Sequence, residues 1–119
     1  MSDEQTTINE LKKVITQFIR ERDWEQFHSI KNVCMDLSVE ASELMEIFTW
    51  ADDQRAKHLL NTKREEVEDE AADVLFALLN FCNICSIDLV KAFENKMKKN
   101  IAKYPVEKAK GKALKYNEL

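Results

Sequence analysis

The stretch EDEAADVLFALLNF, residues 68–81, decides the fold class, because it begins as an acidic helical surface and turns into a nearly continuous apolar run. The apolar residues recur on one broad helical face and continue to about Cys85. Asp73 interrupts this run, with no Lys or Arg within one helical turn of it. A carboxylate among apolar neighbours needs a compensating partner, because an unpaired charge is costly to bury.

The composition of the whole chain also favours helices. The chain has one glycine and one proline in 119 residues, so few of its residues favour turns, and 34% of the residues are charged. Ala, Leu, Glu and Lys dominate, and all four are strong helix formers. We therefore expect an all-α protein, a four-helix bundle in one domain that spans residues 1–119.

The helical spacing of apolar residues predicts four helices. They cover about residues 7–22, 30–50, 63–85 and 88–104. Residues 51–61, ADDQRAKHLLN, are polar and weakly patterned, so we expect a long and mobile connection. Residues 105–119 form a basic tail that we expect to be extended.

Polar residues mark where these helices begin, because their side chains can accept hydrogen bonds from the first free backbone N–H groups. The expected caps are Thr7 with Glu10, Ser29, Thr62 with Glu65, and either Ser86 or Asp88. Tyr104-Pro105 ends the last helix, because proline cannot continue it.

The net charge and the lack of a long apolar segment argue against several function classes. A net charge of −4 repels a phosphate backbone, so we expect no nucleic acid polymer as a partner. No signal peptide and no apolar run of about 18 residues is present, so we expect a cytoplasmic protein without a membrane partner. Cys34, Cys82 and Cys85 are best interpreted as buried small hydrophobic residues rather than a redox or metal set.

Two pairs of carboxylates stand three residues apart on the second and third predicted helices. Glu40 and Glu43 form one pair, and Glu70 and Asp73 form the other. This spacing puts both acids of a pair on one helical face, with Cβ atoms about 5 to 6 Å apart. If the two helices are antiparallel neighbours, all four acids meet in the groove between them.

Such a group of acids needs protons or cations. Like charges about 6 Å apart repel by roughly 2 to 3 kcal/mol per pair at an effective dielectric of about 20. Hard oxygen ligands without softer ones suit Mg²⁺, with Mn²⁺ as a substitute. The alternative is an ordinary solvated acidic face. A di-iron centre is remote, because Glu25-x-x-His28 is the one motif of its kind in the chain.

The residues around these acids carry a family resemblance. Residues 24–50, WEQFHSIKNVCMDLSVEASELMEIFTW, followed by EDEAADVLF, resemble the MazG-like all-α nucleoside triphosphate pyrophosphohydrolases, most closely the dCTP pyrophosphatase-like branch. The hallmark of that family is Glu-x-x-Glu followed after a gap by Glu-x-x-Asp. KMKKNIAKYP, residues 96–105, and the closing KYNEL match as well. Ile30 departs from the family pattern, in which a proline is frequent there.

The resemblance implies Mg²⁺-dependent hydrolysis of a nucleoside triphosphate to the monophosphate and pyrophosphate. It makes Glu40, Glu43, Glu70 and Asp73 the catalytic metal ligands. By position, Glu43 is our candidate for an acid that serves instead as general base to a water, and a water polarised by the metal is the alternative. It also implies further residues that bind the nucleobase or the phosphates. These are Trp24, His28 and Trp50 for the base, and Lys96, Asn100 and Tyr104 for the phosphates.

Apolar residues on more than one side of the second and third predicted helices favour self-association. The resemblance also implies a homo-oligomer, a dimer or a tetramer, with active sites lined by more than one chain. Nucleotide-pool cleansing or balancing, on a dCTP-like or modified deoxynucleotide, is the expected role. A non-catalytic helical adaptor or regulator, with an acidic groove that binds a partner, is the alternative.

Overall fold

The computed structural model describes all 119 residues, and every regular element in it is helical. Six α-helices and two short 3-10 segments are present, without a strand, so the prediction of an all-α protein is confirmed. The chain divides into two compact units, Met1–Ser86 and Ile87–Leu119.

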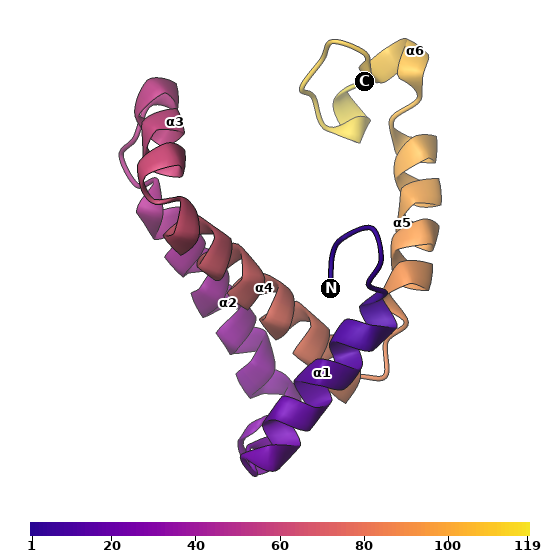
Figure 1. Ribbon diagram of the computed structural model, residues 1–119. Coiled ribbons are helices and arrows are strands. Elements are labelled where there is room, and N and C mark those ends of the chain that lie inside the picture. Colours follow the sequence, from indigo (N-terminus) through magenta and orange to yellow (C-terminus); the bar gives the residue numbers. More distant parts are fainter. The chain divides into compact units, whose positions relative to one another are not determined.

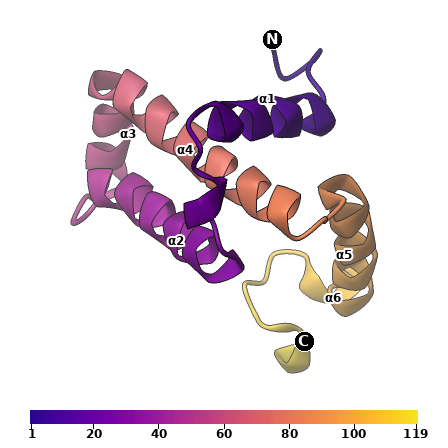
Figure 2. The same ribbon diagram turned by 90° about the horizontal axis from the view of Figure 1, so that it is seen from below.

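The first unit contains α1 (Ile8–Glu21), α2 (Ile30–Ile47), α3 (Asp53–Thr62) and α4 (Arg64–Ile84), with a 3-10 turn at Glu25–Phe27. The helices α2 and α4 lie side by side and run in opposite directions (Figures 1 and 2), and they share the most extensive helix contact. Because α4 also contacts α1 and α3, it is the central helix of this unit.

The core of the first unit explains why α4 is apolar on several sides. Buried side chains come from all four helices. They are Ile15 and Ile19 on α1, Val33 on α2, Leu59 on α3, and Ala77, Leu79 and Cys82 on α4. Asn83 adds a polar link, because its Nδ2 donates to the carbonyl of Lys12 at 3.1 Å and to Oγ1 of Thr16 at 3.2 Å. Contacts on both sides therefore hold α4 in place.

The cysteines differ in their surroundings. Cys82 is buried, and this burial raises the pKa of its thiol, as expected for a residue that serves as a small hydrophobe. Cys85 is partly buried and Cys34 is exposed. The interpretation as buried hydrophobic residues therefore holds for Cys82 and fails for Cys34.

The second unit contains α5 (Leu89–Lys103), the short α6 (Val106–Ala109) and a 3-10 turn at Tyr116–Glu118. Asp88 caps α5, since its Oδ1 accepts from the N–H of Lys91 at 3.1 Å. The rings of Tyr104 and Tyr116 contact edge to face, with centroids 6.4 Å apart. The end of the chain therefore folds back on the end of α5.

The expected N-terminal caps of α1 and α2 are confirmed. Oγ1 of Thr7 accepts from the N–H of Glu10 at 3.1 Å, and the Glu10 carboxylate accepts from the N–H of Thr7 at 3.0 Å. Oγ of Ser29 accepts from the N–H of Asn32 at 3.1 Å. Of the two candidates for the cap of α5, Asp88 is the one that makes the bond.

Three expectations about local structure are wrong. Residues 51–61 are not a loop, because Oδ1 of Asp52 accepts from the N–H of Arg55 at 2.8 Å and starts α3. Thr62 does not cap the next helix; it ends α3 and donates to the carbonyl of His58. The tail is not extended, because it holds α6 and the last 3-10 turn.

Three of the four predicted helices, α1, α2 and α4, lie in the first unit, and the fourth, α5, lies in the second. A four-helix bundle within one chain therefore stays a prediction. No single helix has the length and apolar character of a membrane span. Only α4 and α5, taken together across the break between them, meet that test, on length and composition alone.

Candidate functional site

Three carboxylates from two helices form a compact acid cluster. Glu40 and Glu43 stand one turn apart on α2, and Glu70 faces them from α4. One carboxylate oxygen from each lies within 4.8 Å of the others. For these three acids, the structure confirms the prediction that the pairs meet in the groove between the two antiparallel helices.

The acid cluster is electrostatically unfavourable without a cation. Oε2 of Glu40 and Oε2 of Glu70 are buried, and neither has a hydrogen-bond partner. Burial, followed by repulsion from Glu43 and Asp73, raises the pKa of Glu40 to about 7. Burial and then the charge of Glu43 also raise the pKa of Glu70. Two buried oxygens without donors fit a hard divalent cation, which accepts such ligands.

Asp73 stands at the edge of the acid cluster. Its side chain is exposed and lies outside the set of three that approach within 4.8 Å. Its charge nevertheless helps to raise the pKa of both Glu40 and Glu70. The interpretation of Asp73 as a carboxylate held among apolar side chains is therefore wrong for the single chain.

A cavity of about 440 Å³ adjoins the acid cluster. This volume is within the range of known small-molecule sites. The cavity is lined by acids, aromatic rings, amides and one histidine. The lining residues are Phe18, Trp24, His28, Asn32, Val33, Asp36, Glu40, Asp73, Phe76 and Asn80.

Helical spacing gives this cavity two different ends. Asn32, Asp36 and Glu40 follow one another by four residues on α2, so they share one face. Because α4 runs in the opposite direction, its Asp73 lies at the same end as Glu40. Asn80 lies at the end of Asn32, away from the acid cluster.

Aromatic rings form part of the cavity wall. Trp24 contacts Phe18 edge to face at 5.7 Å between centroids, and Phe18 contacts Phe76 in the same way at 5.8 Å. The rings of Trp24 and His28 have centroids 6.5 Å apart. The structure thus brings two of the predicted base-binding residues, Trp24 and His28, into one cavity.

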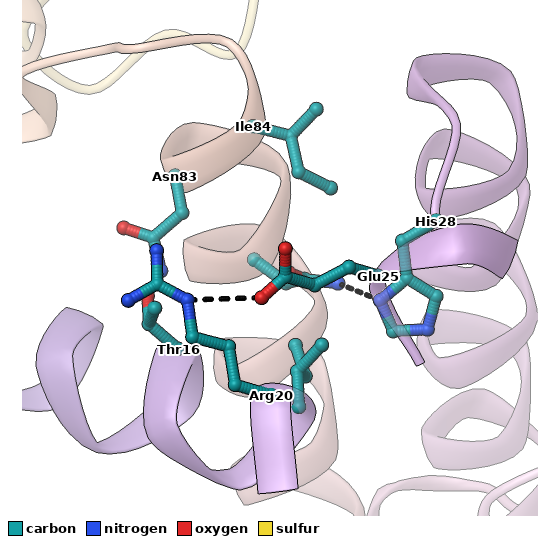
Figure 3. Close-up of a pocket in the computed structure, with 8 residues that line it drawn as sticks. Thr16, Arg20, Glu25, His28, Asn83 and Ile84 are labelled. Carbon is teal, nitrogen blue, oxygen red and sulfur yellow. Dashed lines mark hydrogen bonds and ion pairs between the residues drawn. The ribbon is translucent and has the colours of Figure 1, made fainter. Parts of the chain in front are cut away.

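A second cavity, of about 300 Å³, is lined by residues of α1, of the turn around Glu25 and His28, and of α4 (Figure 3). Arg20 and Glu25, which line it, form an ion pair of 2.9 Å. His28 and Asn80 belong to the walls of both cavities, and their side chains are hydrogen-bonded at 3.2 Å. This second cavity holds no group from the acid cluster.

The remaining predicted site residues lie elsewhere. Trp50 is 100% exposed and lines neither cavity of the single chain, so its predicted place beside the base stays a prediction. Its backbone has a φ of +64°, which turns the chain sharply after α2. Lys96 and Asn100 lie on α5 and Tyr104 caps its end, so these three belong to the second unit.

Several cavity residues were missed by the sequence prediction. Asp36 lies four residues before Glu40, a spacing that identifies it as part of the same face. Asn80 follows Asp73 by seven residues, a spacing that places both on one helical stripe. Phe18 and Phe76 carry no signal that separates them from ordinary core residues.

Comparisons with known proteins agree with this geometry. The model of the MazG-like family matches residues 35–119. The dCTP pyrophosphatase 1 of Rattus norvegicus is 35% identical over 115 residues, which are 95% of this chain and 68% of the relative. The dCTP pyrophosphatase 1 of Homo sapiens has the same identity and coverage.

A solved structure supports the same assignment. The crystal structure of a pyrophosphatase from Archaeoglobus fulgidus is similar with a TM-score of 0.80 and 35% identity. The match covers 88% of this chain and 98% of that one. The resemblance stated from the sequence is therefore confirmed.

Proposed function

Because the chain belongs to the MazG-like family, we propose that it is a nucleoside triphosphate pyrophosphohydrolase. The reaction cleaves the linkage between the α- and β-phosphates and yields nucleoside monophosphate and pyrophosphate. A dCTP-like or modified deoxynucleotide is the proposed substrate, since the similar curated proteins are named dCTP pyrophosphatase 1. The observation that carries the proposal is the acid cluster at one end of an aromatic cavity of about 440 Å³.

In this proposal Mg²⁺, or Mn²⁺ in its place, binds at the acid cluster. Glu40, Glu43 and Glu70 would hold the ion, and Asp73 would complete the set from the next turn of α4. The support is the donor chemistry, because oxygen atoms alone, two of them buried without partners, suit a hard cation. Such an ion supplies charge neutralisation and alignment for phosphoryl transfer.

The side chains of the chain have separate roles in the proposed reaction. Glu43 interacts with both Glu40 and Glu70, so it is the candidate to take a proton from the attacking water instead of holding the ion, and a water polarised by the ion is the alternative. Phosphoryl transfer needs positioning more than covalent help, and no nucleophilic side chain is required. Trp24 and His28 bind the base, while Lys96, Asn100 and Tyr104 contact the phosphates.

A homo-oligomer, dimer or tetramer, is part of the proposal. Val39 and Met45 on α2 are exposed, together with the fully exposed Trp50, although Leu79 on α4 is fully buried within the chain. A second copy that covers this apolar surface would give Trp50 the contacts that the single chain lacks. We infer that Trp50 reaches a base pocket in the assembly rather than within its own chain.

Pyrophosphate release from a panel of canonical and modified deoxynucleoside triphosphates, with and without Mg²⁺, tests the proposal. We expect release that requires Mg²⁺ and disappears in Glu40→Gln. The absence of release from a folded protein, shown by circular dichroism, would favour the adaptor or regulator instead. Four further predictions remain open. They are the assignment of residues 1–119 to one domain, a cytoplasmic location, the lack of nucleic acid and membrane partners, and a role in nucleotide-pool cleansing or balancing.

A further inference from the structure

Asn80 is a buried polar side chain without a role in the proposed chemistry. It is 5% exposed and is the one polar residue among the buried side chains of the chain. It belongs to α4 and directly follows the fully buried Leu79, on the side away from the acid end of the same helix. Buried amides are normally hydrogen-bonded, so the partners of Asn80 decide what it contributes.

The bond to His28 fixes the orientation of this amide. Nδ2 of Asn80 lies 3.2 Å from Nδ1 of His28. Because an amide nitrogen only donates, Nδ1 is the acceptor, and the proton of the neutral ring is on Nε2. The bond uses one amide hydrogen, which leaves Oδ1 as an acceptor and the second hydrogen as a donor.

Asn80 lies at the end of the cavity opposite to the acid end. Asn80 follows Asp73 by seven residues, or about 10.5 Å along the helix axis. Phe76 lies between them on the same wall, and Trp24 stands beside His28. A nucleotide with phosphates at the acid end therefore has its base near the aromatic rings and the Asn80 amide.

We propose that Asn80 is a specificity-determining residue, whose Oδ1 accepts a hydrogen bond from the exocyclic amino group of a cytosine-type base. This proposal rests on the proposed function and names the feature of the substrate that the cavity selects. The amide keeps this orientation as long as Nδ1 of His28 is the acceptor, because Oδ1 turned toward an unprotonated Nδ1 would lose the bond. Uracil would therefore place its O4 against Oδ1, and two buried acceptors would face each other without a proton.

The kinetic test compares dCTP with dUTP, which have the same size and differ at this edge of the base. We expect wild type to favour dCTP in kcat/KM by about tenfold or more, since a site built to hydrogen-bond a group rejects analogues without it. Asn80→Leu should lower the dCTP to dUTP ratio by about tenfold, mainly through dCTP. Asn80→Ala serves as the second variant if the leucine variant does not fold.

Asn83→Leu is the matched control, because Asn83 lies on the same helix and lines only the second cavity. It should lower the melting temperature and leave the dCTP to dUTP ratio unchanged. An active wild type whose ratio is the same in Asn80→Leu and Asn80→Ala would overturn this inference while the proposed function stands. A wild type that releases no pyrophosphate from any triphosphate would overturn both.

A spectroscopic test does not depend on turnover. The chain has two histidines, so ¹⁵N NMR of imidazole nitrogens can be assigned with a His58→Gln variant. We expect His28 of the wild type to carry its proton on Nε2, and this preference to weaken in Asn80→Leu. A proton on Nδ1 in the wild type, or no change in the variant, would contradict the proposed orientation of the amide.

Discussion

Glu40 on α2 and Glu70 on α4 approach each other, with Glu43, to within 4.8 Å, and each has a buried oxygen without a hydrogen-bond partner. The contact arises because α2 and α4 are antiparallel neighbours that both place acids at a three-residue spacing. Repulsion between these carboxylates lowers the stability of the metal-free chain. A bound cation neutralises the repulsion and raises the stability.

Removal of one charge from the acid cluster should separate stability from activity. Glu40→Gln and Glu70→Gln are expected to raise the melting temperature of the metal-free protein, because each relieves like-charge repulsion. The same variants should lose about 100-fold or more in turnover, the usual cost of losing a group that stabilises transition-state charge. Thermal melts in EDTA and pyrophosphate assays in Mg²⁺ measure the two effects.

Glu46→Gln is the control for this pair of variants, since Glu46 is exposed on α2 and lies outside the acid cluster. It should change neither the melting temperature nor turnover appreciably. A lower melting temperature for Glu40→Gln in EDTA would contradict this prediction, because it would show that Glu40 stabilises the metal-free fold.

Metal-free stability should decrease with rising pH. The pKa of Glu40 is raised from its ordinary value of 4.5 to about 7 by burial and by Glu43, so the folded state holds this proton more tightly than the unfolded state. This contribution is fully present below about pH 4.5 and is lost as pH rises through about 7. Melting temperatures in EDTA across this range should fall, and the fall should be smaller in Glu40→Gln.

Addition of Mg²⁺ should reverse the trend, because the ion competes with protons for the same carboxylates. The increase in melting temperature caused by Mg²⁺ is expected to be larger above the pKa of Glu40 than below it. Equal pH slopes for wild type and Glu40→Gln in EDTA would contradict this explanation.

Asn83→Leu should weaken the contact between α1 and α4. Nδ2 of Asn83 donates to the carbonyl of Lys12 and to Oγ1 of Thr16, and leucine of similar size cannot donate to either. We expect a loss of about 1 to 2 kcal/mol, or a melting temperature lower by about 4 to 8 °C. Turnover per folded molecule should be retained; a loss of turnover without a loss of stability would contradict a purely structural role.

Trp50→Ala should act on assembly rather than on the folding of one chain. Trp50 is fully exposed, so its removal takes away no packing within the chain. If a second copy covers it, the variant should dissociate at higher concentration than the wild type and show a raised KM. Light scattering measures the mass, and a wild-type mass of 13.9 kDa at micromolar concentration would contradict the predicted homo-oligomer.

Periodicity predicted α1, α2, α4 and α5 to within a few residues, because each has a repeating apolar face. It missed α3, in which Leu59 is the one buried residue of the helix. That helix depends on the Asp52 cap and on contact with α4, and neither produces a strong apolar pattern.

The acid cluster was predictable for a similar reason, since Glu40, Glu43 and Glu70 follow helical spacing on two adjacent helices. The exposure of Asp73 was not predicted, because the prediction relied on its neighbours in sequence, and these point about 100° apart on a helix. Its apolar neighbours therefore face other directions than its own carboxylate. The position of Trp50 depends on a left-handed backbone conformation that a tryptophan rarely adopts, and no local pattern indicates it.

The most direct test of the proposed function is to identify the products formed from dCTP by ³¹P NMR, with the full chain and Mg²⁺. We predict dCMP and pyrophosphate in equal amounts from the wild type and neither product from Glu40→Gln. Formation of dCDP and orthophosphate, or unchanged product formation by Glu40→Gln, would contradict a pyrophosphohydrolase that works through the acid cluster.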